Sequence, residues 1–421
     1  MTAEMSQTRK RRAPFGVSGC LLGTMVAAAA WSGGFSGFAP PAAAADVQSK
    51  QWYLSAMRAE EMWKVATGEG IKVVVIDSGV NPSTPSLQGQ VLKGLDATGA
   101  DGDEYDDYDG HGTTMAELIA GTGKGGGLQG LAPGAKIVPM RITDTEFQNT
   151  HSVNANDTAD AIRAAADSDA QIISMSFGSD FPGREERAAV TYAQSKGKLF
   201  FAAVGNEAKK GNKEEYPAAY PEVVGVAATD RTGKVSDTSQ HGNFVDIAAP
   251  GNDVPFWCDQ KFERYCQGNG GTSAATAITS AAAALIWSAH PEWTANQVLN
   301  VLFDTAGRGD WKKGTLSNYL GHGIIRPAVN LLRGKGDPGD PDISPLTKER
   351  TSGVPGSSAS ASSQPEKSEK NEKAGDTAMA GSTAGAEKGD DSRLGLILGG
   401  VAAVVVLGGG AFVLVRRRRA V

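Results

Sequence analysis

Residues 73–77 read Val-Val-Val-Ile-Asp, four consecutive apolar residues followed directly by a carboxylate. A short run of branched apolar residues is typical of a strand that is buried on both faces of a parallel sheet. Similar runs recur along the chain and alternate with segments of helical periodicity. The expected strands cover residues 73–76, 137–138, 172–175, 199–204, 223–228 and 245–248, and the expected helices cover residues 113–120, 158–166, 185–195 and 272–289. This alternation predicts an α/β fold in which helices cover both faces of a mostly parallel sheet.

The composition is that of a globular protein. The chain has 421 residues, of which 40% are hydrophobic and 21% are charged, and this apolar content is enough for a sizeable core. It excludes a wholly disordered chain. The net charge of −6 gives no reason to expect a nucleic-acid partner. Three cysteines are too few for a small scaffold held together by many disulfides.

The amino-terminal segment has the pattern of an export signal. Basic residues at positions 10–12 precede an apolar, small-residue stretch at 15–30, and an alanine-rich segment follows. We predict a secretory signal peptide over residues 1–45, cleaved near Ala45. A lipoprotein signal at Cys20 and a twin-arginine signal are the alternatives. The longest apolar run lies after Cys20 rather than before it, and the residues after the arginines fit the twin-arginine pattern poorly.

The carboxyl-terminal segment predicts a membrane anchor. The stretch from Leu394 to Val415 holds 22 residues without a charge, and as a helix it would span about 33 Å, enough for a bilayer core of about 30 Å. Four arginines follow at once, which places the tail 416–421 in the cytoplasm and the preceding chain outside. Residues 336–393 are rich in Pro, Gly, Ser, Ala, Lys and Glu, so we predict a disordered linker. One globular unit is left, over residues 46–335.

Three residues with catalytic chemistry stand at the end of an expected strand or at the start of an expected helix. Asp77 follows the first strand, His111 stands in Asp-Gly-His-Gly-Thr-Thr-Met, and Ser273 stands in Gly-Gly-Thr-Ser-Ala-Ala-Thr. In parallel α/β sheets the functional groups gather at the carboxyl ends of the strands. A serine nucleophile needs a base within hydrogen-bond reach, and a histidine base needs a carboxylate that orients its ring. Each motif alone is common, but the three in this order predict catalysis by a serine, a histidine and an aspartate.

Other short motifs accompany these three. They are Gly-Leu-Ala-Pro-Gly at 130–134, Ser-Met-Ser-Phe-Gly at 174–178, Ala-Val-Gly-Asn at 203–206, Tyr-Pro-Ala at 216–218 and the segment 236–251, which ends in Ala-Pro-Gly. With these motifs, about residues 51–330 resemble the subtilisin family of serine proteases. The resemblance implies a subtilisin-like three-layer fold and hydrolysis of peptide bonds in protein or peptide substrates. We expect no cofactor and assign no metal ligand.

The layout of the whole chain narrows the resemblance. A signal peptide, one carboxyl-terminal span and a short basic tail are similar to those of the mycosins, the membrane-anchored subtilisins of type VII secretion systems. This implies a single-pass membrane protein with an extracytoplasmic catalytic domain, and partners among the membrane components of a type VII secretion system. The alternative is a mainly structural subunit of a secretion complex, in which the protease fold serves as a docking surface.

The resemblance also assigns roles to further residues. It implies that the Asn206 side-chain amide and the Ser273 backbone N–H bind the oxyanion of the tetrahedral intermediate. It implies too that an exposed strand edge beside the site pairs with an extended substrate peptide. The residues of this edge are Ser174, Met175, Ser176, Phe177 and Gly178.

Two positions depart from the family pattern. Ala277 stands four residues after Ser273, where proline is usual, and Glu117 stands on the histidine helix, where glycine is usual. Neither is a catalytic group. Glu117 nevertheless brings a bulky, charged side chain close to a packed helix.

The cysteines fit the predicted compartment. Cys20 falls in the signal region, which leaves Cys258 and Cys266 as a pair in the segment before Ser273. Outside the membrane these two should form a disulfide. Zinc binding is the alternative, but no histidine stands beside them with the spacing of a ligand.

An acidic run precedes the histidine motif. Residues 101–109 hold six carboxylates in nine positions. They suit a solvated acidic loop, a calcium site or a surface for a basic partner, although their spacing does not fit an EF-hand.

The start of the globular unit is rich in apolar side chains. Residues 46–70 include several aromatic residues and methionines that would be costly to leave in water. We therefore expect this segment to pack permanently on the catalytic domain as an extension that is not removed. Activity would then need no self-cleavage.

Overall fold

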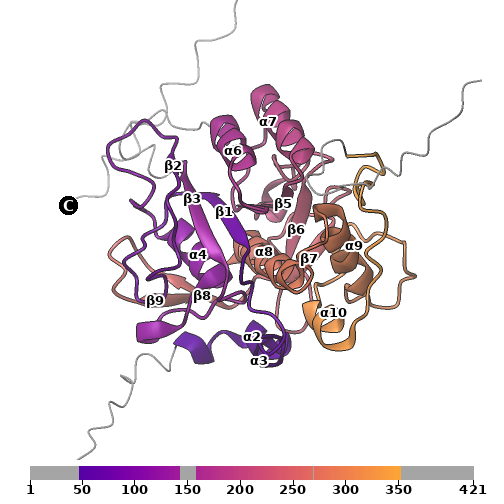
Figure 1. Ribbon diagram of the computed structural model, residues 1–421, viewed down its shortest axis with the longest axis horizontal. Helices are drawn as coiled ribbons and strands as arrows, with labels where there is room; N and C mark the ends of the chain where they lie inside the picture. Colours follow the sequence, from indigo (N-terminus) through magenta and orange to yellow (C-terminus); the bar gives the residue numbers. More distant parts are fainter. Residues whose placement is uncertain (1–46, 143–157, 269, 352–421) are drawn as a thin grey trace, which may run out of the picture. The chain divides into compact units, whose positions relative to one another are not determined.

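The computed structural model describes residues 47–142, 158–268 and 270–351, coloured along the sequence in Figure 1. The predicted signal peptide and the predicted span from Leu394 to Val415 lie outside these residues. The helices are α2 (Trp52–Ala56), α3 (Ala59–Met62), α4 (His111–Ala120), α6 (Thr158–Asp167), α7 (Arg184–Ser195), α8 (Gly271–Ala289), α9 (Ala295–Thr305) and α10 (Pro327–Arg333), with short 3-10 turns η1 (Lys124–Gly126) and η2 (Ala208–Lys210). The strands are β1 (Lys72–Asp77), β2 (Leu95–Asp96), β3 (Lys136–Arg141), β4 (Ile172–Met175), β5 (Leu199–Ala203), β6 (Val224–Thr229), β7 (Ile247–Pro250), β8 (Val254–Trp257) and β9 (Tyr265–Gly268).

The central sheet has seven strands in the order β2-β3-β1-β4-β5-β6-β7, and every neighbouring pair runs parallel. Val74 of β1 is level with Val138 of β3 on one side and with Ile173 of β4 on the other. The chain thus moves from β1 to β3 in one direction and later returns to β4 in the other. The carboxyl ends of β1 and β4 therefore flank a switch point, where open α/β sheets bind their ligands. The predicted α/β fold with a mostly parallel sheet is confirmed.

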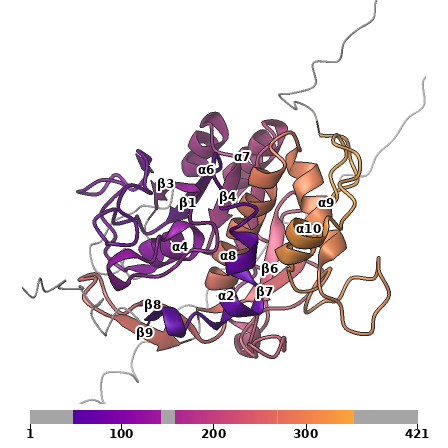
Figure 2. The ribbon, with the colours of Figure 1, turned by 60° about the horizontal axis from the view of Figure 1, so that its bottom comes forward.

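Alternate side chains of β1 show how helices cover both faces of the sheet. Val73 and Val75 pack in the core that includes α4, α8 and α9, whereas Val74 and Ile76 pack in a second core with α6 and α7. Figure 1 shows α6 and α7 together on one side of the sheet, and Figure 2 shows α8, α4 and α2 on the other. A strand that is buried on both faces needs an apolar residue at every position, which explains the uninterrupted run in the sequence.

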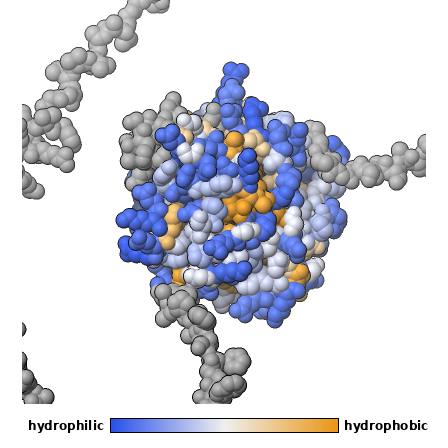
Figure 3. Space-filling model, turned by 60° about the vertical axis from the view of Figure 1, so that its left-hand side comes forward, coloured by the Kyte–Doolittle hydropathy of each residue, from blue (hydrophilic) through white to orange (hydrophobic). Residues whose placement is uncertain are grey.

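Helix α8 lies against the sheet with nearly all of its side chains buried. By length and apolar composition it is the one helix within the described ranges that could cross a membrane. However, 89% of its most apolar 18-residue stretch is buried inside the domain. It is therefore a core helix, and apolar composition alone does not make it an anchor. Figure 3 shows one face of the domain, which is covered mostly by hydrophilic side chains around a small apolar area.

Residues 47–66 pack on the domain, as expected. Tyr53 and Met62 are fully buried. The Gln51 side chain exchanges two hydrogen bonds of 2.8 Å with the backbone of Gln129, and the Trp52 indole N–H donates to the Asn252 carbonyl at 3.0 Å. These contacts join the segment to parts of the chain far away in sequence. That the segment is retained after export stays a prediction.

The globular part extends to residue 351 instead of ending at 335. The Asn300 side chain on α9 donates to the Pro338 carbonyl at 3.0 Å, and the Asn296 side chain donates to the Pro341 carbonyl at 2.9 Å. Leu346 packs against the core. The segment that follows residue 335, which the sequence predicts to be a linker, is thus held on the domain up to residue 351 by side-chain amides of α9.

Candidate active site

Asp77 and His111 meet at the carboxyl end of β1. Asp77 is the last residue of β1, and His111 is the first residue of α4. The Nδ1 atom of His111 lies 2.7 Å from Oδ1 of Asp77, which also accepts a hydrogen bond of 2.8 Å from the Ser78 N–H. The Asp77 side chain is buried, while 34% of the His111 side chain is exposed. With Nδ1 held by the carboxylate, Nε2 is the ring nitrogen left for a reacting group.

The surroundings of His111 favour its protonated form. Burial is the largest single influence and would by itself lower the pKa of the imidazole, but the charge and hydrogen bond of Asp77 and the charges of Asp109 and Asp107 all act in the opposite direction. Together they raise the pKa of His111 from 6.5 to about 9. The site is therefore suited to accept a proton on this ring and to stabilise the imidazolium.

Asp107 holds the start of α4, a role that the sequence analysis missed. Its buried carboxylate accepts hydrogen bonds from the Thr113 N–H (2.8 Å), the Thr113 hydroxyl (2.6 Å), the Gly110 N–H (2.8 Å) and the Ser78 hydroxyl (2.9 Å). Gly110 caps the helix with φ 83° and has no side chain that could accept the free N–H groups, so the carboxylate does so. Burial raises the pKa of Asp107, and the hydrogen bonds oppose that effect. The available signal was the aspartate four residues before the histidine, which the surrounding acidic residues concealed.

The acidic segment before α4 encloses a buried arginine. Arg141, at the end of β3, is 1% exposed, and its Nη1 atom lies 3.3 Å from Oδ2 of Asp96. The same nitrogen donates to the carbonyl oxygens of Asp101 and Asp103 at 3.3 and 3.2 Å, and the guanidinium lies 5.2 Å from the centre of the Tyr108 ring. The expectation of a freely solvated loop is therefore only partly correct, because the acidic segment already contacts a cation of the same chain. Within the ranges that the structure describes, no group of three or more His, Cys, Asp or Glu side chains is arranged to hold a metal.

Ser273 stands in the first turn of α8. Its hydroxyl donates to the Ser176 carbonyl at 3.1 Å, and the Ser176 hydroxyl donates back to the Ser273 carbonyl at 3.2 Å. These bonds join α8 to the segment that follows β4, the strand beside β1. Among the described residues no hydrogen bond links Ser273 to His111, so the structure pairs His111 with Asp77 but not with the serine. Such hydrogen bonds are often long or misaligned without substrate, and a rotation of the serine side chain would redirect its hydroxyl.

The Asn206 side chain is oriented by the start of α8. Its Oδ1 atom accepts the Thr272 N–H at 3.0 Å and lies 3.3 Å from the Thr272 hydroxyl. Because both donors engage the oxygen, the amide nitrogen points the other way. The residue is exposed and follows β5 closely. Its NH₂ group is therefore available as a donor near Ser273.

The predicted substrate-binding segment is only partly exposed. Ser174 and Met175 belong to β4, which pairs with β1 on one side and with β5 on the other, and both residues are buried. They have no free edge for a peptide, which corrects the prediction for these two residues. Ser176 is also buried, and exposure begins at Phe177 and Gly178. The backbone that follows β4 is thus the part left for an extended peptide.

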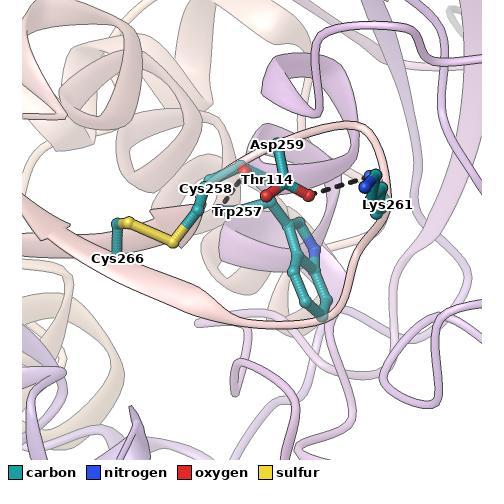
Figure 4. Close-up of a disulfide and its surroundings, with 6 residues drawn as sticks. All are labelled: Thr114, Trp257, Cys258, Asp259, Lys261 and Cys266. Atoms are coloured by element: carbon teal, nitrogen blue, oxygen red, sulfur yellow. Dashed lines mark hydrogen bonds between the residues drawn. A yellow bond between two sulfur atoms is a disulfide. The ribbon is translucent and has the colours of Figure 1, made fainter.

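A disulfide hairpin contacts α4. Strands β8 and β9 pair antiparallel with Trp257 opposite Tyr265, and a disulfide joins Cys258 to Cys266 with a Cα–Cα distance of 5.1 Å. The Trp257 N–H donates to the hydroxyl of Thr114 on α4 at 3.1 Å, as Figure 4 shows. The expected disulfide is present. It closes a hairpin that is hydrogen-bonded to α4, the helix that begins with His111.

Glu117 is fully buried in the last turn of α4. Its Oε2 atom accepts a hydrogen bond of 2.7 Å from the Tyr265 hydroxyl, and its Oε1 atom accepts one of 2.8 Å from the Thr84 hydroxyl. Burial raises the pKa of Glu117 from 4.5 to about 7, against the effect of these hydrogen bonds. The bulky residue therefore does not disrupt the helix packing. It links α4 to β9, and so to the disulfide hairpin.

A model of the subtilase family, peptidase S8, matches residues 68–323. The chain belongs to the subtilase family. Thermitase from Thermoactinomyces vulgaris is 33% identical to this subtilase over 279 residues, which cover 64% of this chain and 95% of thermitase. The major intracellular serine protease of Bacillus subtilis (strain 168) is 34% identical over 254 residues, which cover 59% of this chain and 78% of that protein. This membership makes the chain a serine endopeptidase, as the motifs predicted.

Solved structures of mycosins resemble the subtilase as well. MycP1 from Mycobacterium smegmatis shares 26% of its residues with a TM-score of 0.56, over 72% of this chain and 89% of its own. A serine protease MycP1, described as an essential component of the type VII (ESX-1) secretion system, is 31% identical with a TM-score of 0.54, over 66% of this chain and 88% of its own. These likenesses confirm the subtilisin-like fold and the resemblance to mycosins.

Proposed function

We propose that this subtilase is a membrane-anchored serine endopeptidase that hydrolyses extracytoplasmic proteins, with Ser273 as nucleophile, His111 as general base and Asp77 as the carboxylate that orients it. The observation that carries this proposal is the 2.7 Å contact between His111 Nδ1 and Asp77 Oδ1. It lies at the end of β1, and the neighbouring strand β4 leads to Ser176, which contacts the nucleophile.

In the proposed reaction the Ser273 hydroxyl turns from the Ser176 carbonyl to Nε2 of His111 and gives its proton to that nitrogen. The serine oxygen attacks the scissile carbonyl carbon at the same time. The Asp77 charge stabilises the imidazolium, which then passes the proton to the leaving amine and releases the first product. Water hydrolyses the acyl-enzyme by the same sequence, again with His111 as the base.

The oxyanion of each tetrahedral intermediate needs donors that are already in place. The Asn206 NH₂ group and the Ser273 backbone N–H are the proposed donors, at the positive end of the α8 dipole. Support comes from Thr272, whose N–H holds the Asn206 oxygen and so keeps the amide nitrogen free. In subtilisin, a relative of this chain, loss of such an asparagine costs about 10²–10³ in turnover.

The proposed membrane anchor and secretion role rest on the sequence and on likeness to mycosins. The uncharged stretch from Leu394 to Val415 and the four arginines after it support a single span with the catalytic domain outside. MycP1 is described as an essential component of a type VII secretion system. By extension, we propose the membrane components of such a system as partners of this subtilase.

Two experiments test the proposal. The full-length wild-type protein in detergent should cleave an unfolded protein and react with a fluorophosphonate at Ser273. Ser273→Ala should lose both activities, with a loss of cleavage on the order of 10⁶, and should unfold at the wild-type temperature. Ser273→Ala protein that cleaves as fast as wild type would contradict the assignment.

A second comparison separates catalysis from docking. If the protease activity matters, the proteins secreted by cells with Ser273→Ala should differ from those secreted by cells with the native protein. A further difference between Ser273→Ala and a deletion would show an additional structural role. Identical secretion from native and Ser273→Ala cells, together with a defect in the deletion, would instead support the structural-subunit alternative.

A further inference from the structure

Glu215 lies beside one of the two backbone segments that flank the nucleophile. Tyr216 and Ser179 exchange two backbone hydrogen bonds of 2.9 Å, so the segment before Tyr216 runs antiparallel to the segment that follows β4. This pairing puts Glu215 next to Gly178. Gly178 is two residues from Ser176, which contacts the nucleophile directly.

Two glycines let the Glu215 carboxylate approach both backbone segments. A Cβ atom at Gly178 would overlap Oε2 of Glu215, and a Cβ atom at Gly205 would lie 2.5 Å from Oε1. Gly205 also has a φ of 102°, a conformation that side chains rarely allow. Because Gly205 directly precedes Asn206, one carboxylate borders both the segment proposed to bind substrate and the segment proposed to bind the oxyanion.

The scissile carbonyl of a bound peptide has little freedom in this site. Its carbon must lie about 3 Å from Oγ of Ser273, and its oxygen must lie within hydrogen-bond reach of the Asn206 amide. The residue that supplies this carbonyl therefore lies between Ser176 and Asn206, with its backbone along the segment 176–178. Side chains of an extended peptide alternate between two faces. One of these faces lies between the two segments, both of which the Glu215 carboxylate borders.

The charge of this carboxylate is not balanced by an ion pair. Among the described residues no cation pairs with Glu215, and the neighbouring Lys213 pairs with Asp180 instead. Burial raises the pKa of Glu215, a hydrogen bond from Gln240 lowers it, and the charges of Asp180 and Glu207 raise it further. A half-buried carboxylate without a cation is unfavourable, and a cationic substrate side chain would relieve that cost.

We propose that Glu215 makes this protease prefer lysine or arginine at the residue that supplies the scissile carbonyl. The inference rests on the proposed catalytic role of Ser273. Lysine and arginine suit the site because each carries its charge at the end of a flexible apolar stem, which can reach past the backbone to a carboxylate. The substrates would then be proteins with an extended, accessible segment that contains a basic residue.

The test uses four peptides that differ only at this residue, which is lysine, arginine, methionine or glutamate. The full-length protein should cleave the lysine and arginine peptides with a kcat/KM at least about tenfold above that of the methionine peptide, and the glutamate peptide most slowly. Glu215→Gln keeps the size of the side chain and removes its charge. It should bring the lysine and methionine peptides within about threefold of each other. Glu214→Gln alters the exposed neighbour and should keep the wild-type preference.

The outcomes distinguish this inference from the proposed function. Equal rates for the lysine and methionine peptides in the wild-type protein would overturn the inference and leave the serine-protease assignment intact. An equal loss of preference in Glu214→Gln would overturn it too, because a diffuse charge effect would then explain the selectivity. If Glu215→Gln does not fold, the wild-type rates for the four peptides decide alone. If no peptide is cleaved and a fluorophosphonate does not label Ser273, the proposed function fails and the inference fails with it.

Discussion

Replacing Glu117 by glutamine should make the protein more stable at pH 8 and leave its stability at pH 4 nearly unchanged. The Glu117 carboxyl is fully buried, and burial raises its pKa from 4.5 to about 7 because the charged form loses its water. Between pH 4.5 and about pH 7 the carboxyl of the unfolded chain releases its proton, while the same carboxyl in the folded protein keeps it. A rise in pH through this window therefore favours the unfolded chain.

The expected size of the effect follows from this pKa difference. A pKa raised from 4.5 to about 7 corresponds to about 3 kcal/mol of unfolding free energy, at about 1.4 kcal/mol per pKa unit. Below pH 4.5 the folded protein keeps this amount of unfolding free energy in full, and above about pH 7 it has lost all of it. Glutamine has nearly the same shape and does not titrate. The hydroxyls of Thr84 and Tyr265 can each donate or accept, so both can remain hydrogen-bonded to the amide.

Urea unfolding at pH 4 and pH 8 measures the effect, with Ser273→Ala as the parent to prevent self-digestion. Between the two pH values, Glu117→Gln should lose about 3 kcal/mol less unfolding free energy than the parent. Burial also raises the pKa of Asp246 to about 7, but this group is present in both proteins and cancels in the difference. Glu60→Gln changes an exposed carboxyl and should follow the parent. Parallel pH curves for the parent and Glu117→Gln would refute the reasoning.

Three further predictions concern the histidine and its supports. With neutral His111 as the proposed base and its pKa raised to about 9, kcat/KM should rise with pH through a midpoint above 6.5, and Asp77→Asn should lower both the midpoint and the rate; a wild-type midpoint at or below 6.5 would contradict this. Asp107→Ala should reduce kcat on the order of 10²-fold with little change in KM, because it loosens the turn that carries His111; steady-state kinetics with an unchanged kcat would exclude this role. Replacing Cys258 and Cys266 by serine should lower the unfolding free energy by about 2.5 kcal/mol for so short a loop, and urea unfolding curves that coincide with the parent would disprove it.

Strand β4 illustrates how much of the fold could be predicted from the sequence. Its bounds, Ile172–Met175, agree with the expected strand, because burial on both faces demands an apolar pattern that depends little on which partner lies opposite. Helix α9 could also have been predicted but was not. Thr294 and Gln297 form a capping box directly before an apolar, periodic segment, and this signal is local in the sequence. A prediction of α9 would also have suggested that the domain extends beyond residue 335.

The candidate site could be predicted only where a motif names the residue. The motifs predict Asp77, His111, Ser273 and Asn206 as site residues, but the groups that orient them come from elsewhere in the chain. Glu117 is bonded to Tyr265, which is 148 residues away in sequence, and such a pairing leaves no local pattern. The sequence pattern likewise predicts that α4 begins two residues after His111. It misses the first turn because no local pattern reveals that the Asp107 carboxylate caps the helix.

The buried polar groups around α4 share one structural consequence. Asp107 is bonded to the first turn of the helix, the Trp257 backbone to its Thr114 hydroxyl, and Tyr265 to Glu117 in its last turn. Burying carboxylates costs stability, and an apolar helix face would have packed without that cost. Hydrogen bonds are directional and join defined atoms. Unlike apolar contacts, they therefore fix how a helix is rotated about its axis and how far it is shifted along that axis. The position of the histidine relative to its aspartate on β1 is therefore set by directional bonds at both ends of α4, and the disulfide hairpin supplies two of the three.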